Sequence, residues 1–267
     1  MIIELFGPPG VGKTTFASAL TIFLRKRGQV VDPVMSYRPA EQVSASASPA
    51  REQWQMLASV RRLARPMAEM VATAGPLLRH SGDVASTAGL MRLLPPKSFI
   101  WSIRLRQYLF RLSRSWDIAG SSPHVVLFDQ GFIQAVCSLA LLSRTTGEAR
   151  MGPALDAIPE ADLLIRLDAP RDILAARLGN RQRHQGRIER FLELDLQTNL
   201  DSIGIIDELR LLLHVRGRRV ISVDSADPHT LQSGVAKAGT DILAWLETKR
   251  SNQAASDRHI SKRSHHA

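Results

Sequence analysis

Short apolar runs alternate along this chain with longer stretches in which apolar residues recur every three or four positions. Runs of the first kind predict buried strands, and stretches of the second kind predict amphipathic helices. Because helical stretches separate the strands, we expect one parallel sheet whose crossover connections are right-handed. The predicted strands are Ile2–Phe6, Val30–Met35, His124–Phe128, Ala161–Leu167 and Arg218–Val223.

Helices are predicted between and after these runs. The first, Lys13–Arg27, has apolar residues at helical spacing and ends before Gly28, a residue that commonly follows a helix. Helices on both faces of a parallel sheet make a three-layer α/β fold, here with five strands. The other segments with helical spacing are Lys97–Trp116, Phe132–Ser143, a stretch from Arg171 onward, Ile188–Val215 and Asp227–Glu247.

The loop between the first strand and the first helix carries a Walker A motif, G-x-x-x-x-G-K-[ST]. Its residues are Gly7, Pro8, Pro9, Gly10, Val11, Gly12, Lys13 and Thr14. Glycines let backbone N–H groups approach phosphate oxygens, and the dipole of the following helix favours the same negative charge. Lys13 is expected to bridge the β- and γ-phosphates, and the Thr14 hydroxyl is expected to bind Mg²⁺. The predicted ligand is therefore ATP with Mg²⁺, held by residues 7–14 and by Thr15.

The whole chain divides into one large domain, an insertion and a tail. We expect a P-loop domain over residues 1–247, interrupted by a mostly helical insertion at 40–122 between the second and third strands. The last segment, 248–267, is polar and basic with little periodicity, and we expect it to be disordered.

Composition and charge indicate the compartment and the candidate partners. A single cysteine, Cys137, excludes an internal disulfide and favours a reducing compartment. No apolar run approaches the roughly 20 residues of a membrane span, so we expect a cytoplasmic protein without a transmembrane segment. Much of the net charge of +10 lies between Arg51 and Gly120, where 11 Lys and Arg face 4 Asp and Glu, and in the tail. An acidic partner or a membrane surface is a candidate to bind these basic regions. The alternative is a basic surface that contacts only solvent.

Among P-loop proteins, two classes lack their signatures here. A GTPase reads guanine with Asn-Lys-x-Asp, which is absent, and a motor ATPase has Asp-Glu where this chain has Asp129 and Gln130. A small-molecule kinase needs an acid near its acceptor and arginines that close over the phosphates. Asp129 follows the third strand, and the candidate arginines are Arg177, Arg181, Arg183, Arg187 and Arg190.

With these motifs the chain resembles the thymidylate kinase-like branch of the P-loop nucleoside and nucleotide kinases. The shared places are the Walker A loop at residues 7–14, called the phosphate loop below, with its helix, Tyr37-Arg38-Pro39 after the second strand, Asp129 after the third, and Leu167-Asp168-Ala-Pro before an arginine-rich lid at about 177–190. The resemblance covers about two-thirds of the chain and does not extend over Ala40–Ser122.

The resemblance implies a role for each matching residue. Lys13, Arg181 and Arg183 would stabilise the transferring phosphoryl group, and Asp129 would bind Mg²⁺ through water or orient the acceptor. The remaining implied contacts are Arg177 stacked on adenine, the loop Ala226–Pro228 at its border, and Arg38 on the acceptor. Gln130 stands where the family has an arginine that holds the acceptor, so ordinary dTMP is not the expected substrate.

We therefore predict a kinase that transfers a phosphoryl group from ATP to a nucleoside, a nucleotide or a similar small metabolite. The alternative is an ATP-binding switch or accessory protein with little turnover, in which the basic insertion meets a protein, membrane or polynucleotide. A homodimer is a further candidate assembly.

Overall fold

The computed structural model of the protein describes residues 1–35, 81–184 and 195–264. Within these ranges five parallel strands form one sheet in the order β2-β3-β1-β4-β5. This sheet confirms the predicted fold class. The strands are β1 (Ile2–Phe6), β2 (Val31–Val34), β3 (Val125–Phe128), β4 (Leu163–Asp168) and β5 (Val220–Asp224).

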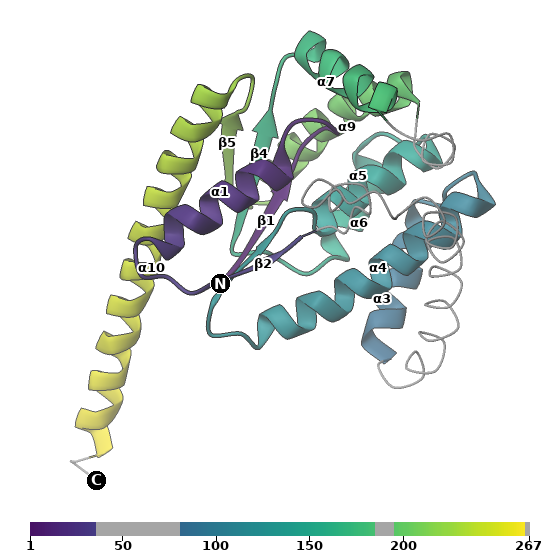
Figure 1. Cartoon of the computed structure of the whole chain (residues 1–267). Coiled ribbons are helices and arrows are strands. Elements are labelled where there is room, and N and C mark those ends of the chain that lie inside the picture. Colours follow the sequence, from purple (N-terminus) through teal and green to yellow (C-terminus); the bar gives the residue numbers. More distant parts are fainter. Residues whose placement is uncertain (36–80, 185–194, 265–267) are drawn as a thin grey trace, which may run out of the picture.

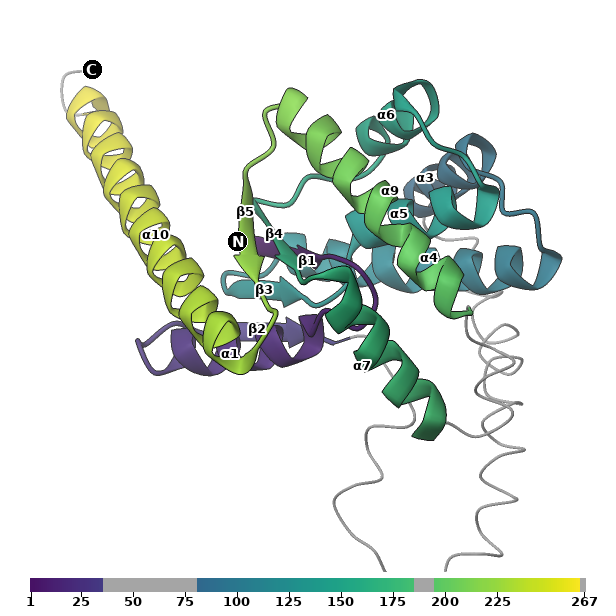
Figure 2. The same cartoon turned by 90° about the horizontal axis from the view of Figure 1, so that it is seen from above.

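Helices cover both faces of the sheet, as predicted. Figure 1 and Figure 2 show α1 and the long α10 on one side and α3, α4, α5, α6 and α9 on the other. The bounds are α1 (Lys13–Arg25), α3 (Ser81–Leu93), α4 (Phe99–Gly120), α5 (Phe132–Ser143), α6 (Glu148–Asp156), α7 (Arg171–His184), α9 (Leu196–Val215) and α10 (Pro228–Ser264).

Strand β1 lies at the centre of the sheet, between β3 and β4. Ile2 is paired with Val126 of β3, and Ile3 is paired with Leu163 of β4. Since all strands run in the same direction, the loops after β1, β3 and β4 meet at one edge. In open parallel sheets this carboxyl edge is where ligands bind.

Side chains of β1 alternate between two hydrophobic cores, as the period of a strand requires. Ile3 and Leu5 pack in the core beneath α1 and α10, while Ile2 and Phe6 pack in the core beneath α4, α5 and α9. Glu4 shares the face of Ile2 and Phe6 and is also buried. One carboxyl group therefore interrupts an otherwise apolar strand.

Helix α4 is anchored to the sheet through Trp116. The Trp116 ring centroid lies 4.9 Å from that of Phe128 and 5.2 Å from that of Phe132. Leu109 and Leu105, two and three turns before Trp116, are buried as well. The apolar residues of the helix predicted at Lys97–Trp116 thus pack on the domain, and the contact with Phe128 brings the helix to the end of β3.

Two elements differ from the prediction. Helix α10 continues to Ser264 although disorder was expected from Thr248, and the stretch contains no Gly or Pro that would end a helix. Helix α6 was not predicted, because Gly152 and Pro153 are poor helix formers in the middle of its nine residues.

Several predictions concern residues outside the described part of the chain. Arg38 and the first half of the insertion lie within 36–80, and Arg187 and Arg190 lie within 185–194. Among the helices that the structure does describe, none combines the length and apolar character needed to cross a bilayer.

Candidate nucleotide-binding site

The phosphate loop has the backbone of an anion-binding nest. Gly10 and Gly12 have φ angles of 81° and 94°, a left-handed conformation that other L-residues rarely adopt. Gly12 directly precedes α1, whose first amides have no acceptor within the helix. The loop and the positive end of the helix dipole therefore favour the same bound anion.

The Lys13 side chain folds back over this loop and is 6% exposed. Its Nζ donates to the carbonyl oxygen of Gly7 at 2.6 Å and to that of Pro8 at 3.1 Å. Phosphate oxygens carry negative charge and accept stronger hydrogen bonds from an ammonium than neutral carbonyls do. The lysine thus lies where a bound triphosphate would attract it.

Thr14 and Asp129 meet across the edge of the sheet. The Thr14 hydroxyl donates to Asp129 Oδ2 at 3.0 Å, although 115 positions separate the two residues. Because β1 and β3 are neighbours, the loops that follow them deliver both side chains to one place. A hydroxyl and a carboxylate are hard oxygen ligands, and Mg²⁺ commonly takes only one or two such protein groups beside phosphate and water. The pair therefore fits the predicted metal.

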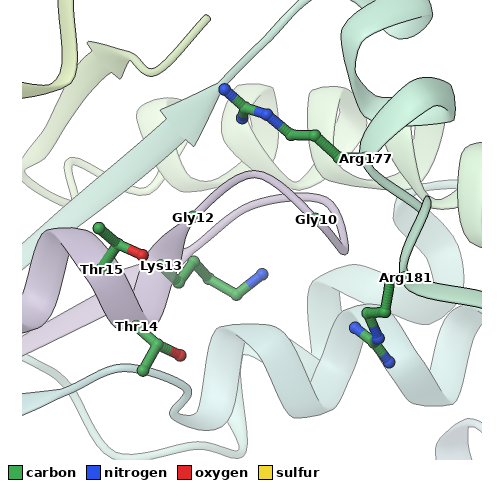
Figure 3. A pocket seen from close by; sticks show the side chains of 7 residues that line it. All are labelled: Gly10, Gly12, Lys13, Thr14, Thr15, Arg177 and Arg181. Atoms are coloured by element: carbon green, nitrogen blue, oxygen red, sulfur yellow. The ribbon is translucent and has the colours of Figure 1, made fainter. Parts of the chain in front are cut away.

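Helix α7 brings two of the predicted arginines to the same cavity. Arg177 and Arg181, one turn apart on α7, flank the phosphate loop in Figure 3. A methyl group added at Gly10 would lie 3.2 Å from Leu178, so the helix packs closely on the loop. The residues that line the cavity are Gly10, Gly12, Lys13, Thr14, Thr15, Arg177 and Arg181.

The Arg177 guanidinium lies against the loop that follows β5. Its Nη2 donates to the carbonyl oxygens of Ser225 and Ala226 at 2.9 and 2.8 Å. This is the loop that the resemblance assigned to the border of adenine. Arg183 lies elsewhere: it is exposed, its Nε donates to the Gly179 carbonyl at 3.4 Å within α7, and it does not line the cavity.

Comparison of the sequence with models of known protein families gives no match, and neither does comparison with curated proteins. Solved structures do match. Deoxyadenosine kinase from M. mycoides with the products dCMP and a flexible dCDP bound is 13% identical, with a TM-score of 0.50 over 91% of this chain and 100% of that one. The same kinase with bound dATP is 14% identical, with a TM-score of 0.47 over 89% and 98% of the two chains. The chain has the fold of a P-loop nucleoside kinase.

Ser225 holds the phosphate loop from the β5 side, and no sequence pattern predicted this contact. Its buried hydroxyl lies 2.7 Å from the Val11 carbonyl oxygen and 3.0 Å from that of Asp168. The Ser225 amide also donates to the Asp168 oxygen at 2.8 Å. One small residue therefore connects the phosphate loop, the end of β4 and, through Arg177, helix α7.

Gln134 fastens the same loop from the opposite side. Its Oε1 accepts a hydrogen bond from the Gly7 amide at 3.3 Å. Gln134 belongs to the first turn of α5, and in the same turn the Ile133 amide donates to the buried Glu4 carboxyl group. A lone acid within an apolar strand was the one sequence signal for this arrangement.

A buried arginine network lies at the end of β4. Arg166 Nε donates to Asp168 Oδ1 at 2.8 Å, and its Nη2 lies 2.5 Å from Asp207 Oδ1 on α9. A buried guanidinium needs such carboxylate partners because desolvation would otherwise be costly. The network ties β4 to α9 beside the phosphate loop.

Proposed function

We propose that this protein is an ATP-dependent kinase whose phosphoryl acceptor is a nucleoside, a nucleotide or a similar small metabolite. The observation that carries the proposal is the contact between Thr14 and Asp129 beside a buried Lys13. A glycine turn without a ligand would need neither a buried ammonium nor a carboxylate brought from another strand. Both groups fit a triphosphate with its metal.

The donor half of the reaction is supported by the cavity around the loop. Lys13 would bind the β- and γ-phosphates, and Thr14 and Asp129 would hold Mg²⁺, which would supply positive charge beside the transferring group. Arg181 lines the cavity from α7 and would neutralise charge that develops during transfer. Arg183 remains a predicted contributor to the same step.

The nucleoside part of ATP would lie toward Arg177. The guanidinium of Arg177 rests on the Ser225 and Ala226 carbonyls, and a planar cation in this position suits stacking on adenine. The backbone after β5 would then border the base.

The acceptor would approach from the side of α4. The Tyr108 hydroxyl of this helix donates to the Gly131 carbonyl at 3.4 Å, two residues beyond Asp129. Asp129 would orient the acceptor hydroxyl, and Gln130 replaces a cation that would hold an acceptor phosphate. A neutral or differently bound acceptor fits this difference better than dTMP does. Membership of the thymidylate kinase-like branch remains part of the proposal.

A labelling experiment tests this function. The full chain would be incubated with labelled ATP, Mg²⁺ and a panel of nucleosides, nucleoside monophosphates and pooled small metabolites, and the products would be separated. We expect one labelled acceptor, which Lys13→Ala abolishes. Lys26→Ala, an exposed lysine at the end of the same helix, is the matched control and should behave as wild type.

The second candidate function is an ATP-binding switch. Gln130 favours it, because the acceptor side lacks the arginine that the kinases carry. Calorimetry with Mg·ATP that gives Lys13-dependent heat, without any labelled product from the panel, would support the switch and contradict the kinase. Absence of heat with both Mg·ATP and Mg·GTP would contradict both.

A further inference from the structure

Glu4 is a buried acid in the central strand that does not line the nucleotide cavity. Glu4 is 1% exposed, and its Oε1 accepts hydrogen bonds from the amides of Ile133 at 2.6 Å and Gln134 at 3.4 Å. These amides belong to the first turn of α5, where a helix has donors without intrahelical acceptors. The carboxyl group of β1 therefore holds the amino end of a helix that follows β3.

The first turn of α5 also connects the phosphate loop with helix α4, on the proposed acceptor side. Gln134 in this turn accepts a hydrogen bond from the Gly7 amide of the phosphate loop. Gly131, directly before α5, accepts one from the Tyr108 hydroxyl of α4 through its carbonyl oxygen. Asp129 lies two residues before Gly131. A shift of this turn would thus move the Asp129 backbone and one end of the phosphate loop together.

The space between Glu4 and this turn is closed. A methyl group added at Gly131 would lie 2.4 Å from Glu4 Cδ and 2.8 Å from its Oε1. Contacts this short are not found in folded proteins, so only a glycine fits beside the Glu4 carboxyl group, which the hydrogen bond from the Ile133 amide at 2.6 Å holds in place. Tight packing of this kind transmits displacement and does not absorb it.

We propose that Glu4 is a positioning residue, which locks the first turn of α5 so that Asp129 and the phosphate loop keep the geometry required for transfer. This rests on the proposed function. Displacement of about 1 Å at a reacting group costs roughly 100-fold in rate. The loop retains its glycine backbone and its α1 amides whatever Glu4 does, so ATP affinity should depend on Glu4 far less than turnover does.

The rival explanation is that Glu4 only stabilises the fold by capping α5. The two explanations diverge for Glu4→Met, which fills a similar volume without an acceptor oxygen. Replacement of buried charged groups by well-packed apolar side chains is often neutral for stability. A capping role predicts a folded variant with normal turnover, whereas a positioning role predicts a folded variant that transfers slowly.

The experiment compares Glu4→Met, Glu4→Gln and Thr21→Val with wild type. Turnover is measured on the acceptor found in the screen, and the Kd of Mg·ATP is measured by calorimetry. For Glu4→Met we expect kcat to fall about tenfold or more while Kd changes by less than about threefold. Glu4→Gln keeps an acceptor oxygen and should restore most of the rate. Thr21, whose buried hydroxyl bonds within α1, controls for loss of a buried polar group and should leave kcat unchanged.

Amide exchange followed by NMR supplies a readout that needs no acceptor. We expect faster exchange of the Ile133 and Gly7 amides in Glu4→Met, by about tenfold or more. A second variant, Gln134→Leu, should speed exchange of the Gly7 amide alone. It removes the acceptor of that amide and leaves the hydrogen bond between Ile133 and Glu4 intact. Normal kcat and unchanged exchange in Glu4→Met would overturn the proposal. If wild type labels no acceptor, the proposed function fails, while exchange at Gly7 still decides whether Glu4 positions the loop.

Discussion

The hydroxyl of Ser225 lies 2.7 Å from the carbonyl oxygen of Val11, a residue 214 positions earlier in the chain. Val11 belongs to the phosphate loop, and Ser225 follows the last strand of the sheet. The bond is buried, so water cannot replace it. The loop that would hold the triphosphate is thus fastened to the strand end that would border the base.

Ser225→Ala should loosen this connection. The Val11 carbonyl would lose its buried donor, which costs about 1–3 kcal/mol in the free energy of unfolding. We also expect weaker binding of Mg·ATP, because the loop is less well held. Urea unfolding and calorimetry measure the two effects. Ser222→Ala, at an exposed position on the strand that Ser225 follows, is the matched control, and equal behaviour of both variants would refute the role of Ser225.

Asp129→Asn tests the carboxylate that meets Thr14. The amide can still accept a hydrogen bond from the threonine hydroxyl, so the loop should keep its structure and ATP should still bind. Loss of the negative charge should lower kcat by about 100-fold, on the order of 3 kcal/mol. Asp117→Asn, an exposed aspartate on α4, should keep normal kinetics. Normal turnover of Asp129→Asn would remove this residue from the catalytic machinery.

Arg177→Ala tests the donor side of the cavity. This change removes the hydrogen bonds to the Ser225 and Ala226 carbonyls and the planar cation beside the proposed adenine position. We expect KM for ATP to rise about tenfold, with a smaller change in kcat, because a contact with the base would be the same before and during transfer. The control is Arg171→Ala, an exposed arginine at the start of the same helix. An unchanged KM would place adenine elsewhere.

Glu4 should make stability depend on pH. Burial raises the pKa of this carboxyl from 4.5 to about 8, against the opposing effects of the α5 amides and of Arg218. The native state then holds the proton more tightly than the unfolded chain. The stability that protonated Glu4 contributes is therefore complete below about pH 4.5 and is lost as pH rises to about 8.

Urea unfolding at about pH 5.5 and about pH 7.5 measures this dependence. Wild type should lose up to about 1.4 kcal/mol per pH unit more than Glu4→Gln, whose side chain does not titrate. Subtracting the variant removes the contribution of other groups. Equal slopes for the two proteins would contradict a raised pKa at Glu4.

Local patterns predicted much of the fold. Strand and helix periods identified the five strands that the structure describes and placed α5 at its observed ends, Phe132 and Ser143. The helix predicted at Lys97–Trp116 is observed as α4, and its apolar residues Leu105, Leu109 and Trp116 are buried. The structure extends α10 from the predicted end at Glu247 to Ser264, because the residues between them include no Gly or Pro that would stop a helix.

The chemistry proposed for the phosphate loop follows from the sequence alone, because its glycines, Lys13 and Thr14 are neighbours in the chain and match the Walker A spacing. The partners of that loop were decided by tertiary structure. Ser225, Gln134 and Glu4 act through contacts across more than 120 residues, and such contacts depend on which strands become neighbours. Spacing along a chain carries no information about the order of strands in a sheet, which only packing of the whole domain selects.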